Sequence, residues 1–128
     1  MDKTILVEKD LLAGKTLIDA LDRSGFDVQS ALWLLEQPQD VWRLYIASEV
    51  VHKQGLLTAY SRLLQVLRTL DIADVLSLDD ISIVSPKDDV IQTFKGLHIR
   101  SLSAPLQLSS SSINNVFVGN AYLYRALP

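Results

Sequence analysis

The run Val28-Gln29-Ser30-Ala31-Leu32-Trp33-Leu34-Leu35 and the run Val41-Trp42-Arg43-Leu44-Tyr45-Ile46-Ala47 decide the fold of this chain. Between them stands the polar break Glu36-Gln37-Pro38-Gln39-Asp40, whose proline interrupts both helices and strand ladders. A break of this length between two strand-like runs is typical of a β-hairpin. We therefore predict a two-stranded antiparallel hairpin over residues 27–48.

Both faces of this hairpin are expected to be apolar. In the second run Trp42, Leu44 and Ile46 alternate with Val41, Tyr45 and Ala47, and only Arg43 interrupts the second set. A sheet that is wet on one side shows a cleaner alternation of apolar and polar residues. We therefore predict that the second face is covered too, by another helix or by a partner chain.

Two longer helices are predicted from apolar stripes at helical spacing. The first covers residues 8–24 and ends where Gly25 supplies a positive φ. The second begins at Leu56 and ends near Asp71. The pattern leaves open whether Thr4–Val7 extends the first helix or forms a separate extended segment.

A short strand is predicted at residues 81–84, followed by a third helix that ends at Gly96. We assign Ser85 as the N-cap of this helix and Pro86 as its first residue, because a hydroxyl and a proline are favoured at those positions. Acidic side chains follow in the first turn, where they complement the helix dipole.

The C-terminal part of the chain is predicted to be a loop over residues 98–112, which include Ser109–Ser112, and then strands at residues 113–118 and 121–125. The expected order of elements is α-β-β-α-β-α-β, with one more strand at the end as the alternative. The fold class that we predict is α+β. It is a single domain over residues 1–128, with a mostly antiparallel sheet of four or five strands and about three packed helices.

The composition is that of an ordinary globular domain with 128 residues, of which 48% are hydrophobic and 21% charged. The formal net charge is −3 and no basic stripe is visible, which argues against a duplex-binding protein. No apolar run is long enough to span a bilayer, and no signal peptide opens the chain. We expect a soluble cytoplasmic protein without membrane association.

The chain contains no cysteine, which excludes disulfides, thiolate metal sites and cysteine nucleophiles. His52 and His98 are far apart and neither lies at metal-ligand spacing, and the five glycines are isolated rather than grouped in a phosphate-binding loop. We therefore predict no metal, no cofactor and no catalytic residue.

Ser85 and Lys87 form the candidate anion site, because backbone N–H groups, a hydroxyl and a lysine meet at a helix start. Capping explains Ser85 and Pro86 completely, and the acids that follow would repel a phosphate, so we favour capping. Four acids flank this region and are interpreted as solvated, because strand alternation and helical rotation keep three of them from converging. They are Asp79, Asp80, Asp88 and Asp89.

A second candidate patch consists of aromatic and arginine side chains on the predicted strands, and such residues are enriched at protein interfaces. They are Trp42, Arg43, Tyr45, Tyr122, Tyr124 and Arg125. Core packing is the alternative interpretation, and stacking on the bases of a single-stranded nucleic acid is a third.

The ordered set of five motifs along most of the chain resembles a family of small uncharacterised bacterial proteins. The motifs are Gly25-Phe26-x-Val28 with Ala31-Leu32-Trp33, Val41-Trp42-Arg43-Leu44, Ile81-Ser82-Ile83-Val84-Ser85-Pro86 and Ala121-Tyr122-Leu123-Tyr124-Arg125. This resemblance implies a bacterial source and no particular activity.

We expect a non-enzymatic module that interacts with another protein or self-associates, with a homodimer as the expected partner arrangement. One alternative is a small hydrolase or phosphoryl-transfer enzyme that uses Ser85–Asp89 with His98 or Arg100. Another is an accessory protein that binds single-stranded nucleic acid through the aromatic and arginine residues.

Overall fold

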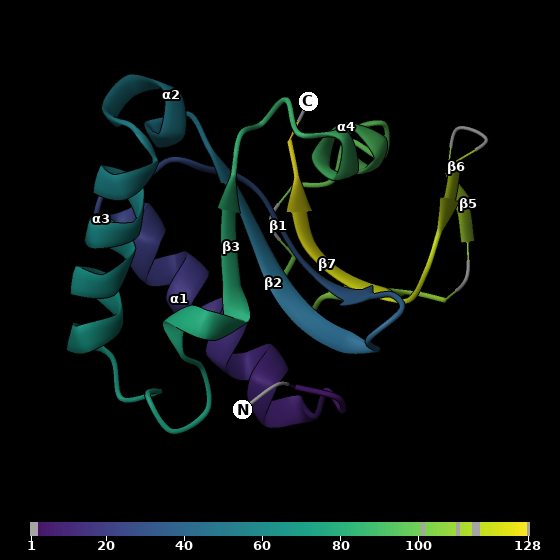
Figure 1. The fold of residues 1–128 in the computed structure, drawn as a ribbon, viewed down its shortest axis with the longest axis horizontal. Helices are drawn as coiled ribbons and strands as arrows, with labels where there is room; N and C mark the ends of the chain where they lie inside the picture. Colours follow the sequence, from purple (N-terminus) through teal and green to yellow (C-terminus); the bar gives the residue numbers. More distant parts are fainter. Residues whose placement is uncertain (1–2, 101, 110, 114–115, 128) are drawn as a thin grey trace.

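The computed structural model describes residues 3–100, 102–109, 111–113 and 116–127, and its centre is a five-stranded sheet (Figure 1). Its strands are β1 (Val28–Glu36), β2 (Val41–Ser48), β3 (Ile81–Val84), β4 (Leu106–Leu108) and β7 (Ala121–Ala126), in the order β3-β2-β1-β7-β4. β2 and β3 run parallel, and the other three neighbouring pairs are antiparallel. The predicted α+β class with a mostly antiparallel sheet is confirmed.

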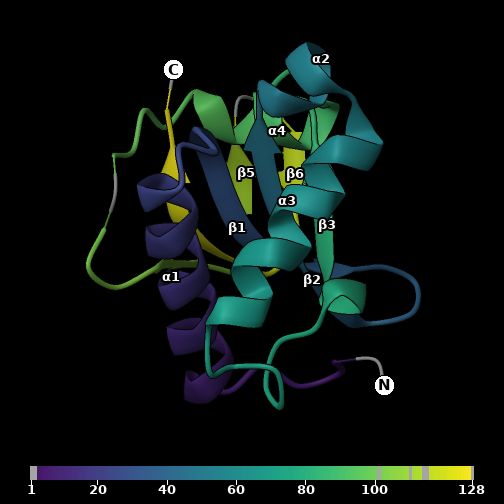
Figure 2. The same cartoon turned by 90° about the vertical axis from the view of Figure 1, so that its left-hand side faces the viewer.

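Helices lie on both sides of this sheet. They are α1 (Glu8–Arg23), α2 (Val50–Gln54), α3 (Leu56–Thr69) and α4 (Asp89–Lys95), with a 3-10 turn, η1 (Leu78–Asp80), leading into β3. Figure 2 shows α1 and α3 side by side over one face, which we call the first face, and α4 lies on the other, the second face. No helix in the described ranges is long and apolar enough to cross a membrane.

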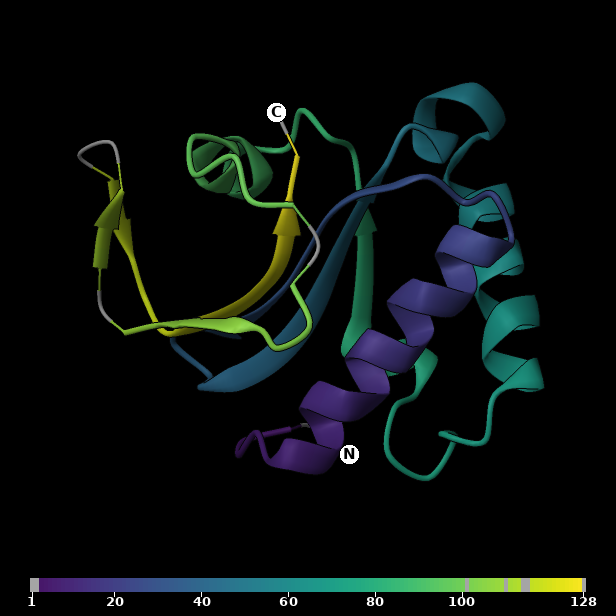
Figure 3. The same ribbon diagram turned by 180° about the vertical axis from the view of Figure 1, so that it is seen from behind.

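A separate two-stranded sheet is formed by β5 (Ser111–Ile113) and β6 (Val116–Val118), which pair antiparallel. Figures 1 and 3 show that this β5–β6 hairpin stands apart from the main sheet, on the side of α4. The chain leaves the main sheet after β4 and returns to it in β7.

The predicted hairpin forms the middle of the main sheet, because the two apolar runs become β1 and β2. Trp33 pairs with Leu44 and Leu32 pairs with Tyr45 across the ladder. The first face packs against α1 and α3 in the larger part of the core, and α4 covers part of the second face with Ile91 and Phe94. Both faces are largely apolar, as predicted, and a helix covers part of the second face.

A bulge in β7 changes which side chains face α1. Ala31 of β1 pairs with Arg125 and the next residue, Leu32, pairs with Leu123, so Tyr124 is an extra residue on β7. Two residues on a bulged strand then oppose one on the partner, which breaks the strict alternation of side chains. Tyr124 and Arg125 therefore both reach α1, where they bond to Leu11 and Asp22.

The contact between α1 and the sheet is closest at Gly14. The phenol of Tyr124 accepts a hydrogen bond from Trp33 Nε1 at 3.0 Å and donates one to the carbonyl oxygen of Leu11 at 2.6 Å. A Cβ atom built on Gly14 would lie 2.5 Å from the Tyr124 oxygen and 3.1 Å from Trp33 Nε1. The absence of a side chain at Gly14 thus lets α1 reach this hydrogen-bonded pair.

Lys3 fixes the N-terminal segment to the rest of the protein. Thr4–Val7 form neither helix nor strand, so they are a separate segment before α1. The amide of Trp42 donates to the Lys3 carbonyl at 2.7 Å, and Lys3 Nζ donates to Asp10 at 2.9 Å and to the Val75 carbonyl at 2.6 Å. Asp80 lies 3.8 Å from the same ammonium group and is 7% exposed. The interpretation of Asp80 as a solvated acid was therefore wrong, because the Ser77 amide, which donates to its carboxylate at 3.0 Å, and the Lys3 ammonium group together compensate for the burial of its charge.

Three other local predictions are corrected. Residues 98–112, predicted to be a loop, contain β4 and part of β5, and the predicted strand at residues 113–118 is divided between β5 and β6. Of the Ser109–Ser112 loop, residue 110 lies outside the described residues. The third helix begins later than predicted, at Asp89, and its N-cap is Asp88, whose side chain accepts a hydrogen bond from the Val90 amide.

Leu63→Asp should unfold the protein, whereas Leu57→Asp on the same helix should not. Leu63 is fully buried on α3 and Leu57 is 84% exposed, so only the first substitution places an unpaired charge in the core. We expect a loss above about 4 kcal/mol for Leu63→Asp and less than about 0.5 kcal/mol for Leu57→Asp in urea denaturation. Equal stabilities of the two variants would show that the helix faces are assigned wrongly.

Gly14→Ala should lower the free energy of unfolding by about 1–3 kcal/mol through overpacking, in spite of the higher helix propensity of alanine. Tyr124→Phe removes the oxygen that the new methyl group would meet. The loss of unfolding free energy in the double variant should therefore be smaller than the sum of the two single losses, by at least about 0.5 kcal/mol. Additive losses in a denaturant-unfolding cycle would contradict the close approach.

Candidate functional site

The six predicted interface residues divide between the two faces of the sheet. Trp42, Tyr122, Tyr124 and Arg125 lie on the first face with α1, and the rings of Trp42 and Tyr122 are 5.7 Å apart at an angle of 50°. Tyr124 is 2% exposed, Arg125 is 8% exposed and Trp42 is 9% exposed. These three side chains therefore have little surface to offer to a partner.

Arg125 joins α1 to the sheet. Its guanidinium donates to both carboxylate oxygens of Asp22, at 3.0 and 2.7 Å, and to the carbonyl oxygen of Val28 at 2.8 Å. The hydrogen bond with Asp22 raises the pKa of the Arg125 guanidinium. A two-pronged, partly buried pair of this kind holds a helix in one orientation.

Arg43 and Tyr45 lie on the second face, where they form a polar cluster with Glu36 and Ser82. Arg43 donates to Ser82 Oγ at 3.0 Å, to the Asp79 carbonyl at 3.0 Å and to the Ile81 carbonyl at 3.2 Å. Tyr45 donates to Glu36, and burial together with this carboxylate raises the pKa of the Tyr45 phenol. The Arg43 guanidinium therefore bonds to β3 and to the turn before it. The Tyr45 phenol stays protonated at neutral pH.

The candidate anion site at Ser85 and Lys87 is a turn rather than a helix start. Ser85 Oγ accepts a hydrogen bond from the Lys87 amide at 3.0 Å and lies 2.6 Å from His52 Nε2. The cap of α4 is Asp88, so the assignment of Ser85 as the N-cap was wrong. Ser85 prefers the turn because its hydroxyl can bond to the backbone two residues ahead.

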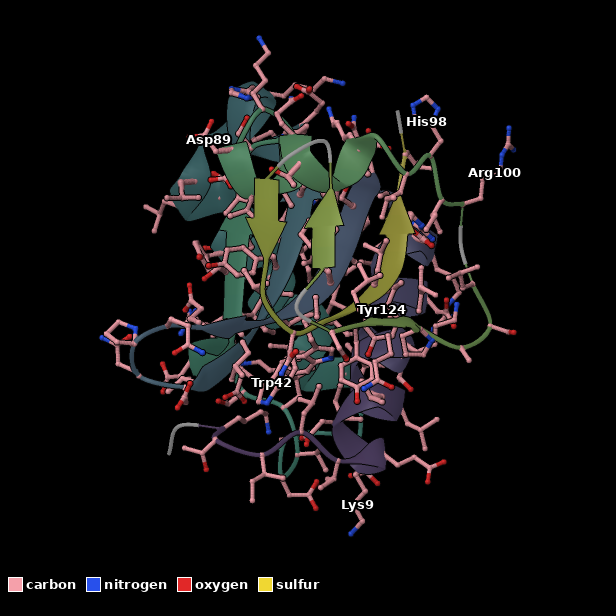
Figure 4. All side chains as sticks on the ribbon, turned by 90° about the vertical axis from the view of Figure 1, so that its right-hand side faces the viewer. Lys9, Trp42, Asp89, His98, Arg100 and Tyr124 are labelled. Carbon is pink, nitrogen blue, oxygen red and sulfur yellow. The ribbon has the colours of Figure 1, made fainter. Side chains whose placement is uncertain are left out.

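The residues of the predicted enzyme alternative are not brought together. Figure 4 shows Asp89 at one end of α4 and the exposed His98 and Arg100 beyond the other end. The imidazole that reaches Ser85 belongs to His52 rather than to His98. In the described part of the chain no carboxylate hydrogen-bonds to His52, so the pair lacks the third group that orients a catalytic base.

The other candidate places for a ligand are a depression on the surface and the acidic side chains. A shallow depression between α1 and α3 is lined by seven residues, of which Arg23 is the one charged side chain. Among the described residues no group of three or more histidines and acids is placed to hold a metal ion.

One long stretch of the sequence contains no charged residue. The 24 residues from Ser101 to Tyr124 include no Asp, Glu, Lys, Arg or His, although 21% of the chain is charged. This uncharged segment contains β4, β5, β6 and most of β7. It therefore supplies one edge of the main sheet and both strands of the projecting β5–β6 hairpin.

The exposed part of the uncharged segment includes β4. Leu106 is 40% exposed, Gln107 is exposed and Leu108 is partly buried. The sequence pattern does not identify these residues, because it predicts a loop over residues 98–112. The signal that could have found them is the length of chain without a charge, since the core of a protein interface is depleted in charged residues.

Comparisons with known proteins add no relative: a scan of family models, a search of curated proteins and a search of solved structures each found no match. The resemblance to a family of bacterial proteins stays a prediction.

Asp88→Ala should lower the free energy of unfolding by about 0.5–2 kcal/mol, the usual effect of losing an N-cap side chain. The matched control is Asp89→Ala, which removes a neighbouring acid in the first turn without removing the cap. Its cost should be smaller, about 0.3–1 kcal/mol, because it affects only the helix dipole. A larger loss for Asp89→Ala in thermal or urea unfolding would contradict the corrected start of α4.

Proposed function

We propose that this protein acts by self-association, as a symmetric homodimer formed through the uncharged segment, and that it is not an enzyme. The observation that carries the proposal is the coincidence of the 24 uncharged residues with an edge strand and a projecting hairpin. Homodimers with twofold symmetry are the commonest closed assemblies of soluble proteins.

The distribution of charge supports this proposal. Charged side chains lose hydration when an interface forms, so interface cores contain few of them. A surface without charges also brings no like charges together when two identical copies meet across a twofold axis. The net charge of −3 is small enough that long-range repulsion between two copies is weak.

Exposed apolar surface supports it as well. Leu106 on β4 is 40% exposed, and the neighbouring Leu108 packs only partly against the second core cluster. Association that covers these leucines would be favoured by about 25 cal/mol for each Å² of apolar surface removed from water. A different protein that covers the same surface is the alternative occupant, and the solution mass of the purified protein distinguishes the two.

The nucleic-acid alternative requires an exposed aromatic ring beside an arginine. Trp42 and Tyr124 are less than one-tenth exposed, and the donors of Arg43 and Arg125 bond to the protein itself. Trp42 and Tyr124 therefore offer no base-stacking platform.

Light scattering at micromolar concentration tests the proposal, and we expect twice the 14.3 kDa mass of one chain. Leu106→Lys should weaken the dimer at least tenfold, because it places a charge in the uncharged segment. Leu57→Lys is the matched control: Leu57 is 84% exposed on α3, outside this segment, and its substitution should leave the mass unchanged. A 14.3 kDa species at all concentrations rejects self-association.

A further inference from the structure

The two edge strands of the main sheet, β3 and β4, differ in how far other parts of the protein cover them. An unpaired edge strand can pair with another chain, and proteins usually protect such edges by covering or charging them. At β3 the amide of Ile83 donates to the Tyr60 hydroxyl of α3 at 3.1 Å, and Arg43 donates to the Ile81 carbonyl at 3.2 Å. Side chains thus occupy backbone groups of β3, and this edge is closed to a further strand.

At the opposite edge, β4, the described residues provide no such cover. Beyond the ladder with β7, none of the backbone hydrogen bonds of the described residues reaches Leu106, Gln107 or Leu108. The strand also carries no lysine or other charge that would discourage pairing. Figure 3, the view from behind, shows β4 in yellow-green beside the lower end of β7.

The register of the sheet identifies which backbone groups of β4 are free. The amide of Leu35 donates to the Asn120 carbonyl at 3.0 Å, and hydrogen-bonded pairs alternate along an antiparallel ladder. Tyr122 therefore directs its N–H and C=O to β1, and Ala121 and Leu123 direct theirs to β4. Because Gln107 stands opposite Tyr122, its own N–H and C=O point away from β7.

We propose that β4 pairs antiparallel with β4 of a second copy about a twofold axis at Gln107, which joins the two main sheets into one. This inference rests on the proposed self-association and names the surface that performs it. Gln107 and the partner's Gln107 exchange two backbone hydrogen bonds. Leu106 then stands opposite the partner's Leu108, and the reverse pair forms on the other side of the axis.

The sequence of β4 fits this pairing better than pairing with an unrelated strand. Leu106-Gln107-Leu108 reads the same in both directions, so an antiparallel twofold axis sets leucine against leucine and glutamine against glutamine. Cross-strand apolar pairs of this kind stabilise a sheet. The leucine pairs lie on the second face, beside Leu123 and Ala121, so they extend an apolar surface that already exists.

A single cysteine tests this geometry, because the chain has none of its own. In Gln107→Cys the two thiols would belong to residues about 5.5 Å apart between Cα atoms, which lies within the range that disulfides span. Mild oxidation, or a short bismaleimide reagent, should convert most of the protein into a covalent dimer on a non-reducing gel. Leu57→Cys, with a fully accessible thiol on α3, is the control and should give little covalent dimer under the same conditions.

Gln107→Pro provides an independent measurement, because proline removes the outward N–H while an edge strand tolerates it. The dimer should dissociate at least tenfold more readily, whereas Gln107→Ala, which keeps the N–H, should dimerise as the parent does. Circular dichroism checks that each variant is folded. If Gln107→Pro does not fold, the cross-linking of Gln107→Cys still tests the pairing. A dimeric mass without cross-linking at Cys-substituted Gln107 overturns the β4 pairing and leaves self-association intact, whereas a monomeric mass overturns both.

Discussion

The hydroxyl of Tyr124, held between Trp33 and the Leu11 carbonyl, is the contact on which the arrangement of this protein depends. It joins the last strand, the first strand of the hairpin and the first helix at one buried point. An unpaired phenol or indole N–H would be costly there, so the three elements are stable only together. Gly14 makes the meeting sterically feasible, because a side chain on that turn would occupy the place of the phenol oxygen.

α1 and α3 therefore cover the first face of the main sheet. The two edge strands of this sheet, β3 and β4, differ from each other. Tyr60 and Arg43 cover backbone groups of β3, while in the part of the chain that the structure describes no hydrogen bond covers the outer edge of β4, which lies in an uncharged segment. Arg43 has a structural task in this arrangement, since its guanidinium bonds to β3 and its flank rather than to a ligand. The contrast between the edges is the basis for placing self-association at β4.

The candidate site could be anticipated only in part. The rule of alternation correctly separates Trp42 from Arg43, and the predicted apolar second face is present. The same rule fails at Tyr124 and Arg125, because a bulge adds a residue to β7 and turns both side chains towards α1. Ser85 was assigned to a cap because the choice between a serine turn and a serine cap depends on where the following helix begins, which Asp88 decides.

The sequence by itself determined the hairpin, the first helix with its glycine stop and the α+β class, because these depend on local periodicity and turn residues. Only the tertiary structure decided the burial of Asp80 beside Lys3, the meeting of His52 with Ser85 and the open edge at β4. Each of these joins residues that are far apart in the chain, or depends on which strand lies beside which. Such pairings come from the packing of the whole sheet, and no local pattern of residues specifies them.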